Sequence, residues 1–478
     1  MNINVNRKTC GIINKYWTKC VGSCHAATAL REDWRKQLTI CRDEFGFEYV
    51  RFHGLFDDDM SVCLRNDNGE LEYSFFNIDS IFDFLLSIGM KPFIELSFMP
   101  GVLASGTKTV FHYRGNITPP KSYDEWGTLC GKFAAHLVEC YGIDEVEKWF
   151  FEVWNEPNLK DIFWSGTLEE YLELYRSAAL AIKQVDPRLV VGGPSTAVNA
   201  WIPETRQFCE KNNVPLDFIS THHYPTDSGI GLGLEVEEHM ARSDRNTLHT
   251  TLKKALKESG GYPLYYSEWN SSPSPRDRFH DTSYCASFIA KNIIDNLGLT
   301  DIYSFWTFSD IFEECGFSSV PFHGGFGLLN IHGIPKPSYR AFQLLNGLKG
   351  ERLEASAEEA SPTVDYAASR DGDRITVLLS NFHVLNAPIK AEKVSVHIAG
   401  IGQVKSAYIE RIDEAHANPK RAWTEMGSPT YLTTAQIREL TKRSELIKEP
   451  VNAVAGGEGA RVDLVIEPHS VVRITIGL

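Results

Sequence analysis

Short apolar runs alternate with longer segments of helical periodicity over most of the chain. A short apolar run bounded by turn residues is typical of a strand buried on both faces, as in a parallel sheet. Apolar residues repeated every third or fourth position predict amphipathic helices. The expected strands are Lys19–Val21, Glu48–Phe52, Pro92–Leu96, Trp149–Trp154, Leu189–Gly192, Phe218–Thr221, Leu264–Ser267 and Ile302–Thr307, and the expected helices are Leu30–Glu44, Ile78–Ile88, Tyr123–Tyr141, Leu168–Val185, Ile202–Asn212, Leu248–Glu258, Tyr284–Leu297 and Tyr339–Leu348.

This alternation favours a closed (β/α)8 TIM barrel over an open doubly wound sheet, because each expected strand is followed by an expected helix. No G-x-G-x-x-G or P-loop sequence follows an early strand, which removes the commonest motifs of the open alternative. We therefore expect an α/β fold with a catalytic barrel over residues 1–350, whose strands begin at about residue 17.

After residue 350 the pattern changes to alternating apolar and polar positions. The segments RITVLLSNF, KVSVHIAG and ARVDLVIEPHSVVRITI have the period of two that is typical of half-buried strands. One helical segment, Thr434–Ile447, interrupts them. Residues 351–478 are therefore expected to form a C-terminal β-sandwich accessory domain.

Composition narrows the class of partner. The 478 residues carry a formal net charge of −14 and no long run of Lys and Arg, which argues against binding to nucleic acid or to an anionic membrane. No apolar segment is long enough to span a bilayer, and the N-terminus lacks the apolar core of a signal peptide, so we expect a cytoplasmic protein. The 10 cysteines show no CxxC spacing that would suggest zinc or a redox pair.

Polar residues follow several expected strands, at the end of a barrel where active sites are built. The stretch WFFEVWNEPNL, Trp149 to Leu159, places Glu156 directly after a buried strand, and YYSEWNSS places Glu268 after another. The strand-end side chains are Ser23, His25, His53, Asn155, Glu156, His222, Tyr224, Glu268 and Trp306.

Two carboxylates that face each other across a barrel mouth suit cleavage of a glycosidic bond. Either glutamate alone could cap a helix or pair with an arginine, but both together, each after an aromatic-rich strand, favour catalysis. His222 and His223 lack a third ligand at a helpful spacing, so we expect neither a metal nor another cofactor. Phe111, Phe163 and Trp306 could stack on a sugar ring or could belong to the core.

Several motifs in order resemble the glycoside hydrolases of family 39, in particular its β-xylosidases. They are VGSCHA, LREDW, GFEYVRFHGLFDDDM, FFEVWNEPNL, FISTHHYPTD, YYSEWNSS, SDIFEE and PFHGGFGLLNIHGIPKPSYRAF, spread over residues 17 to 345. The resemblance implies a catalytic barrel with a β-sandwich, and hydrolysis by double displacement with retention. Cys24, where the family typically has glycine, and the segment SPSPRDRFHDTSY depart from the pattern, and the second departure leaves the aglycone preference open.

The same resemblance implies roles for individual residues. Glu156 matches the acid/base and Glu268 the nucleophile, so the pKa of Glu156 should be raised by apolar surroundings and by the charge of Glu268. Glu268 must stay ionised, which needs hydrogen-bond donors such as Tyr224. Asn155 is expected to bind the sugar 2-hydroxyl. Other residues expected to bind substrate are His53, His222, Trp306, Phe111, Phe163 and Glu313, with Glu314 able to take the place of Glu313.

The expected activity is that of an exo-acting β-D-xylosidase that trims xylo-oligosaccharides. The rivals are a family member acting on α-L-iduronide or arabinose-containing glycans, and a non-catalytic carbohydrate-binding protein. An iduronidase needs cationic groups for the substrate carboxylate, and Arg51 is expected to point away from the site if His53 points in. The sequence leaves open the exact sugar, the chain length, exo or endo action, transglycosylation and whether the chain forms a homo-oligomer.

Overall fold

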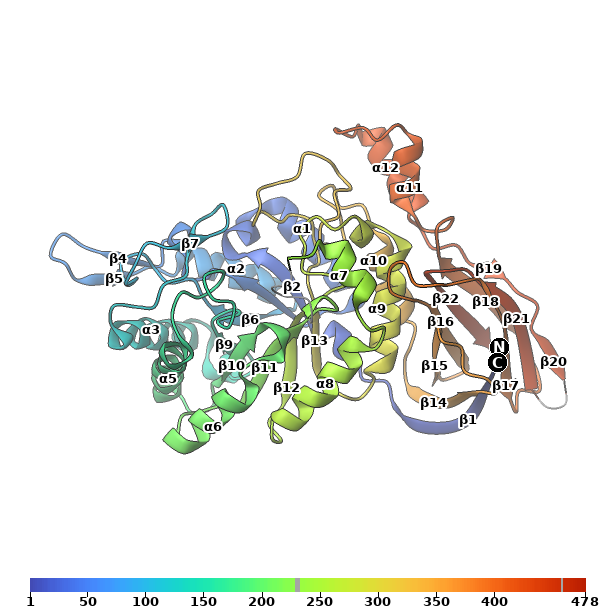
Figure 1. Cartoon of the computed structure of the whole chain (residues 1–478), viewed down its shortest axis with the longest axis horizontal. Coiled ribbons are helices and arrows are strands. Elements are labelled where there is room, and N and C mark those ends of the chain that lie inside the picture. The colour runs from blue at the N-terminus through green and yellow to red at the C-terminus, as the bar shows by residue number, and fades with distance from the viewer. Residues whose placement is uncertain (228–232, 457–458) are drawn as a thin grey trace.

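The computed structural model describes residues 1–227, 233–456 and 459–478. A helix-covered barrel occupies one end of the molecule and a large β-sheet the other (Figure 1). Helices α9 (Ser283–Asp295) and α10 (Pro337–Leu345) lie between the two, where Phe288 of α9 packs on Phe382 with ring centroids 5.7 Å apart.

Eight parallel strands close into the barrel, as the sequence predicts. Each strand starts or ends within a few residues of its expected position, since buried parallel strands are continuous apolar runs. The strands are β2 (Cys20–His25), β3 (Tyr49–His53), β6 (Lys91–Leu96), β9 (Phe150–Val153), β10 (Val190–Thr196), β11 (Phe218–His223), β12 (Leu264–Trp269) and β13 (Ile302–Phe305).

The expected outer helices also form. In α5 (Leu168–Val185), Thr167 and Glu170 make a capping box that satisfies backbone donors at the first turn, and the apolar face of the helix covers β9 and β10. The other helices around the barrel, besides α9 and α10, are α1 (Glu32–Phe45), α2 (Phe76–Ser87), α3 (Tyr123–Tyr141), α6 (Ile202–Asn212) and α8 (Thr247–Glu258), with the shorter α4 (Ile143–Val146) and α7 (Val236–Arg242).

The barrel interior is layered. At the N-terminal ends of the strands Cys20, Phe93, Phe218 and Ile302 form an apolar plug that closes this end. The next layer toward the C-terminal ends contains charged groups, including Arg51, which is fully buried. Because the plug closes one end, polar chemistry is confined to the other, where the strand-end residues lie.

The second domain is one continuous ten-stranded sheet that curls around its own apolar core. In the part of the chain that the structure describes, all neighbouring strands run antiparallel except β1 and β17. The strand order is β19 (Glu449–Pro450), β18 (Ser406–Ile412), β22 (Ser470–Gly477), β16 (Arg374–Asn381), β15 (Val364–Asp371), β14 (Glu351–Ala357), β1 (Asn2–Ile12), β17 (Glu392–Ala399), β21 (Gly459–Ile466) and β20 (Val454–Gly456).

Strand β1 differs from the expected domain division, which assigns residues 1–350 to the barrel. It lies between β14 and β17, and Ile3 and Val5 are fully buried in the sheet core. The stretch INVNRKTCGI alternates only at its start, so its partner was not evident from its pattern. We propose residues 13–350 as the barrel domain and residues 1–12 with 351–478 as the accessory domain.

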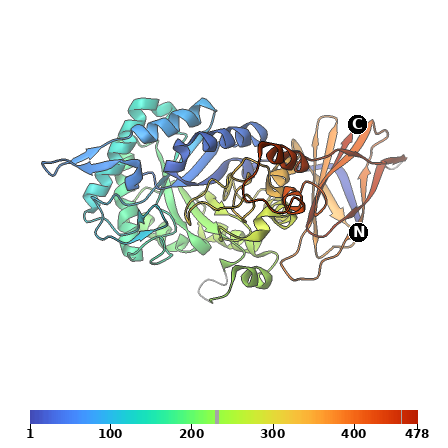
Figure 2. The same ribbon diagram turned by 90° about the horizontal axis from the view of Figure 1, so that it is seen from above.

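A helical insertion leaves the sheet and packs on the barrel mouth. It contains α11 (Pro419–Glu425), which the sequence did not predict, and α12 (Thr434–Arg443), which ends earlier than expected. Its Trp423 packs on Phe322 in the loop after β13, with ring centroids 5.6 Å apart, so the insertion supports a loop at the open end of the barrel (Figure 2). None of the described helices is both long and apolar enough to cross a membrane.

The place of β1 in the sheet core generates a stability prediction. Replacing Ile3 with alanine should lower the free energy of unfolding by about 2–5 kcal/mol, because a fully buried side chain is lost. Ile12 is 70% exposed at the other end of the same strand, so Ile12→Ala should change the free energy of unfolding by less than about 0.5 kcal/mol. Denaturant unfolding measures both, and equal effects of the two substitutions would contradict the placement of β1.

Candidate active site

Arg51 is the centre of a buried ionic network inside the barrel. Its guanidinium contacts three carboxylates and two neutral acceptors: Nε lies 2.6 Å from Glu152 Oε2, Nη1 2.9 Å from Glu268 Oε1, and Nη2 2.8 Å from Glu95 Oε2, 2.8 Å from Asn155 Oδ1 and 3.0 Å from Ser195 Oγ. Burial alone would lower the pKa of Arg51, but Glu152, Glu95 and Glu268 raise it overall, so the guanidinium stays charged.

The expectation that Arg51 points away from the site is wrong. Side chains two residues apart in a strand lie on the same face, so Arg51 and His53 of β3 both point inward. Glu95 and Glu152 were not predicted either, although each interrupts an otherwise apolar strand. A charged residue in such a strand is a usable signal, because a buried charge needs a partner.

Glu268, at the C-terminal end of β12, is surrounded by donors. Arg51 contacts Oε1, and the Tyr224 hydroxyl donates to Oε2 over 2.9 Å. Burial raises the pKa of Glu268 above its ordinary value and Glu95 adds to the rise, while Arg51, His53 and the Tyr224 hydrogen bond limit it. The donors around Glu268 therefore favour its ionised form more than the surroundings of Glu156 favour that of Glu156.

Glu156, in the turn after β9, is held in a different environment. The residue has φ of 44° and its backbone N–H donates to Ser195 O over 2.8 Å, which ties this turn to the end of β10. Burial raises the pKa of Glu156 well above its ordinary value, and the charge of Glu268 raises it further. Glu156 is thus the carboxyl group that holds a proton.

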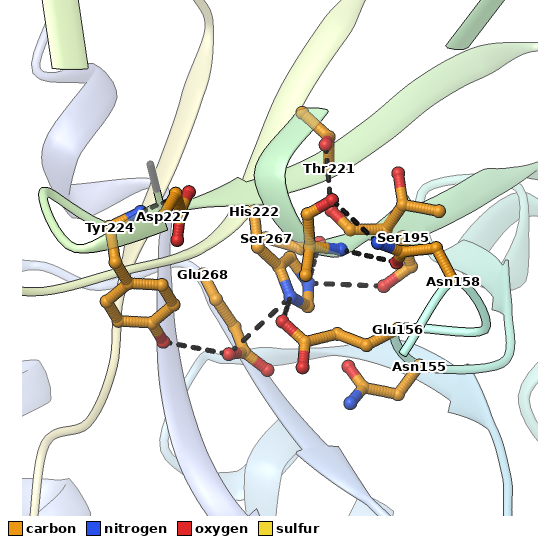
Figure 3. Close-up of polar contacts among 12 residues, drawn as sticks. Asn155, Glu156, Asn158, Ser195, Thr221, His222, Tyr224, Asp227, Ser267 and Glu268 are labelled. Carbon is orange, nitrogen blue, oxygen red and sulfur yellow. Dashed lines mark hydrogen bonds and ion pairs between the residues drawn. The ribbon is translucent and has the colours of Figure 1, made fainter. Parts of the chain in front are cut away.

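His222 links the two glutamates from β11 (Figure 3). Its Nδ1 lies 2.9 Å from Glu156 Oε1 and 3.6 Å from Glu268 Oε2. One oxygen of each glutamate and one nitrogen of His222 all lie within 4.8 Å of one another. Both carboxyl groups are almost fully buried, with Glu156 7% and Glu268 4% exposed, so a reacting group between them would be shielded from bulk water.

The same three residues have a spacing that a cation could use. However, Glu268 already contacts the Arg51 guanidinium and the Tyr224 hydroxyl, and Glu156 contacts His222. The fixed positive charge of Arg51 beside the cluster opposes a second cation. This donor set suits proton transfer better than metal binding, and the absence of a metal requirement stays a prediction.

Asn155 and His53 also face this space. Asn155 Oδ1 accepts from Arg51, and its buried Nδ2 has no hydrogen-bond partner among the described residues, so it is free to donate to a ligand. His53 Nδ1 lies 2.7 Å from Glu95, and its Nε2 lies 3.9 Å from Glu268 Oε1. Burial alone would lower the pKa of His53, but Glu95 raises it overall.

Aromatic rings form the wall beside His53. Trp306 and Phe163 lie with ring centroids 4.9 and 6.0 Å from the imidazole, and Phe111 lies 5.4 Å from Phe163. Trp306 rests on Gly22, where a Cβ atom would come within 2.4 Å of the indole, so this close approach needs glycine. These three rings, for which the sequence left core and ligand roles open, border the same space as the carboxylates.

Glu313 and Glu314 point to different places. Glu313 Oε1 lies 3.4 Å from His25 Nε2, whereas Glu314 Oε1 lies 3.6 Å from His53 Nε2 and so faces the site. Burial raises the pKa of Glu314 to about 8; His53 opposes this, and Glu268 and Glu95 add to it. The geometry thus favours Glu314 over Glu313 as the glutamate that borders the pocket, the alternative that the sequence left open.

Comparison with known proteins identifies the class. The family model for glycosyl hydrolases family 39 matches residues 1–459, so the chain belongs to this family, as its motifs predict. It is an enzyme of the glycoside hydrolase class. It is 62% identical over 479 residues to a β-xylosidase from Caldicellulosiruptor saccharolyticus, covering 100% of this chain and 98% of that one.

Two further relatives extend the comparison. A β-xylosidase from Geobacillus stearothermophilus is 36% identical over 444 residues, which cover 89% of this chain and 86% of that one. The crystal structure of a monomeric β-xylosidase from Caulobacter crescentus superposes with a TM-score of 0.88 at 34% identity, covering 100% of this chain and 99% of that one. The likeness therefore includes both the barrel and the accessory sheet.

The environment of Glu268 generates a pH prediction. Because the Tyr224 hydroxyl donates to the carboxylate and lowers its pKa, removing the hydroxyl in Tyr224→Phe should raise the pKa of Glu268 further. The acidic limb of kcat/KM for an aryl glycoside should move to higher pH accordingly. Tyr16→Phe removes a buried hydroxyl that donates to Ile293 O and should leave the limb in place. If the acidic limb does not move in Tyr224→Phe, the hydroxyl of Tyr224 does not stabilise the ionised form of Glu268.

Proposed function

We propose that the protein is a retaining, exo-acting β-D-xylosidase that releases xylose from the non-reducing ends of xylo-oligosaccharides. The observation that carries the proposal is the pair Glu156 and Glu268, two buried carboxyl groups with oxygens within 4.8 Å of His222 and of each other, in environments that separate their pKa values. One protonated and one ionised carboxyl group are what glycoside hydrolysis requires.

In the first half of the reaction Glu268 attacks the anomeric carbon. The C1–O bond to the leaving group breaks, and the proton of Glu156 moves to the leaving oxygen. Asn155 Nδ2, which has no protein partner in the described structure, donates to the sugar 2-hydroxyl, where contacts strengthen in the oxocarbenium-like transition state. Arg51 and Tyr224 stabilise Glu268 until its charge passes to the forming ester bond.

In the second half the ester no longer carries the charge of Glu268. This removes one cause of the raised pKa of Glu156, so Glu156 stays ionised and accepts a proton from the attacking water. The water breaks the bond between C1 and Glu268 and restores the original configuration. Oxygens of Glu156 and Glu268 lie within 4.8 Å of each other. This is closer to the separation of about 5–5.5 Å typical of retaining enzymes than to the separation of about 6.5–9.5 Å that inversion needs to hold a water.

The pocket walls favour a xylose residue and exo action. Loops after three strands meet across the mouth: His112 donates its backbone N–H to Glu314 O over 3.1 Å, and Arg276 donates to Cys315 O over 3.4 Å. Contacts of this kind between loops across the mouth favour binding of the end of a chain over binding of its middle. Phe111, Phe163 and Trp306 offer apolar surface, which suits a sugar without a C5 substituent.

The rival substrates fit less well. An α-L-iduronide needs a cation for its carboxylate, but Arg51 is already paired with Glu95, Glu152 and Glu268. A non-catalytic binding protein would have no need for two neighbouring carboxyl groups with different pKa values. A cytoplasmic location stays a prediction.

The sugar preference is tested with a panel of aryl glycosides. The β-D-xyloside should be cleaved faster than the α-L-arabinopyranoside, α-L-iduronide and β-D-glucoside, since the last two carry a C5 substituent that meets the aromatic wall. Initial rates with wild-type enzyme measure the order. Faster cleavage of the iduronide or glucoside would overturn the proposed substrate.

The two glutamates are distinguished by azide rescue. With 2,4-dinitrophenyl β-D-xyloside, Glu268→Ala should lose activity and azide should restore it with formation of the α-xylosyl azide, since azide replaces the nucleophile on the opposite face. Glu156→Ala should lose about 10²- to 10⁴-fold on phenyl β-D-xyloside and yield the β-xylosyl azide from the dinitrophenyl substrate.

An exposed glutamate supplies the control. Glu173 lies on the outer face of α5 with its side chain 39% exposed, so Glu173→Ala should match the wild type in both assays. Nuclear magnetic resonance of the products identifies the anomer. The opposite pairing of anomers and variants would exchange the two roles.

A further inference from the structure

The roles assigned to Glu156 and Glu268 do not determine which ring nitrogen of His222 carries its hydrogen. Burial lowers the pKa of His222 well below its ordinary value, and the charges of Arg51 and two neighbouring histidines add to the effect, so the imidazole is neutral. Only one of its nitrogens then carries a hydrogen. Nδ1 faces Glu156, while Nε2 lies 3.2 Å from Ser195 Oγ and 3.1 Å from Ser267 Oγ (Figure 3).

The two serine hydroxyls are not equivalent. Ser267 donates its single hydrogen to Glu152 Oε1 over 2.7 Å, so it offers His222 only a lone pair. Ser195 Oγ accepts a hydrogen from Arg51 Nη2 over 3.0 Å, which leaves its own hydrogen free for Nε2. The Ser267 lone pair alone would favour a hydrogen on Nε2, so Ser195 is the hydroxyl of the pair that can donate to Nε2 and thereby favour the hydrogen on Nδ1.

The other side of the ring favours the same tautomer. Nδ1 lies 2.9 Å from Glu156 Oε1 and 3.6 Å from Glu268 Oε2. An N–H group is attracted by these oxygens, whereas a nitrogen lone pair would be repelled by the ionised Glu268. Arg51 thus acts on Glu156 through a chain of hydrogen bonds that runs from its guanidinium through Ser195 and His222.

The backbone supplies a second observation. Ser195 has φ of 55°, in the left-handed region where glycine is favoured and other residues are strained. Its side chain is fully buried, so the hydroxyl does not serve solubility. A serine at this position is explained by the two hydrogen bonds that its hydroxyl makes, to Arg51 and to His222.

We propose that Ser195 is a positioning residue that holds His222 in the Nδ1–H tautomer and so keeps the acidic proton of Glu156 on the oxygen not bonded to His222. The inference rests on the proposed function, because it needs Glu156 to be the acid/base. In the other tautomer Nδ1 would accept the proton of Glu156 and direct it away from the leaving oxygen. After glycosylation the ionised Glu156 would face a lone pair.

The proton balance is simple. During glycosylation the proton of Glu156 moves to the leaving oxygen, and His222 keeps its own proton. During deglycosylation Glu156 accepts one proton from water while His222 donates the same hydrogen bond as before. The fixed tautomer therefore serves both halves, and Ser195 exchanges no proton with substrate.

The test uses leaving groups of different acidity. Ser195→Gly suits the positive φ and removes the hydroxyl. Its kcat/KM should fall about tenfold or more on phenyl β-D-xyloside, which needs protonation, but by less than about threefold on the 2,4-dinitrophenyl xyloside, whose leaving group does not. Ser195→Cys, which keeps a weak donor, should recover part of the loss, and it provides a second variant should Ser195→Gly fold poorly.

The pH dependence of kcat/KM distinguishes loss of the tautomer from a general loosening of the site, because the two move the alkaline limb in opposite directions. Without Ser195, Glu156 donates to Nδ1 and its acid form is stabilised, so the alkaline limb of kcat/KM should move to higher pH. A loosened site that admits water would lower the pKa of Glu156 and move the limb to lower pH. The second result, or an equal loss on both substrates, would overturn the proposal.

Ser267→Ala is the matched control. Both serines are fully buried and each lies next to Nε2, but only Ser195 is free to donate to it. Any loss in Ser267→Ala should be equal for the two substrates, and a leaving-group dependence like that of Ser195→Gly would overturn the assignment to Ser195. Wild-type cleavage of the dinitrophenyl xyloside reports the proposed function separately, so a failure of that function is recognised before the variants are compared.

Discussion

The buried guanidinium of Arg51 is the interaction on which the rest of the site depends. Three carboxylates converge on it in the middle of the barrel, and each would be costly to bury without it. Removing one partner of such a cluster leaves uncompensated charge in a medium that cannot solvate it. The apolar plug below and the aromatic wall above keep water away, so the ionic pairing must be made by the protein itself.

The charge of Arg51 also makes the pKa values of the two glutamates differ. Arg51 contacts Glu268 directly, whereas its hydrogen-bonded connection to Glu156 runs through the neutral side chains of Ser195 and His222. Glu268 therefore receives most of the stabilisation of a carboxylate, and Glu156 receives mainly the effect of burial and of the negative charge beside it. Two identical side chains thus acquire different pKa values, in part because they lie at different distances from one cation.

The sequence predicts the parts of this arrangement that depend on local pattern. The barrel strands are apolar runs, and the motifs at their ends identify Glu156 and Glu268, so both could be found without a structure. Arg51 was missed because its environment is formed by strands distant in sequence, although its spacing of two from His53 places both side chains on one face. Strand β1 was missed because its neighbours, β14 and β17, follow it by more than 300 residues.

The choice between Glu313 and Glu314 shows where local pattern ends and packing begins. Adjacent residues in a loop have no periodicity from which the direction of each side chain could be predicted. Here Cys24 helps to fix the backbone, because its Sγ accepts the N–H of Glu313 over 3.3 Å. The loop is also supported from outside. Lys336, fully buried, pairs with Asp310 of this loop and with Asp281 of the segment after β12, and the Lys420 ammonium of the helical insertion donates to Arg278 O of that neighbouring segment over 2.8 Å.

These supports connect the accessory domain to the pocket. Trp423 of the insertion packs on Phe322, which lies in the same loop as Glu314, so residues of the accessory domain contact the segment that closes the site. A loop that carries a buried carboxyl group has to be held from both sides, because water would otherwise enter and lower the pKa that burial raises. The accessory sheet can thus affect the barrel chemistry without contributing a side chain to it.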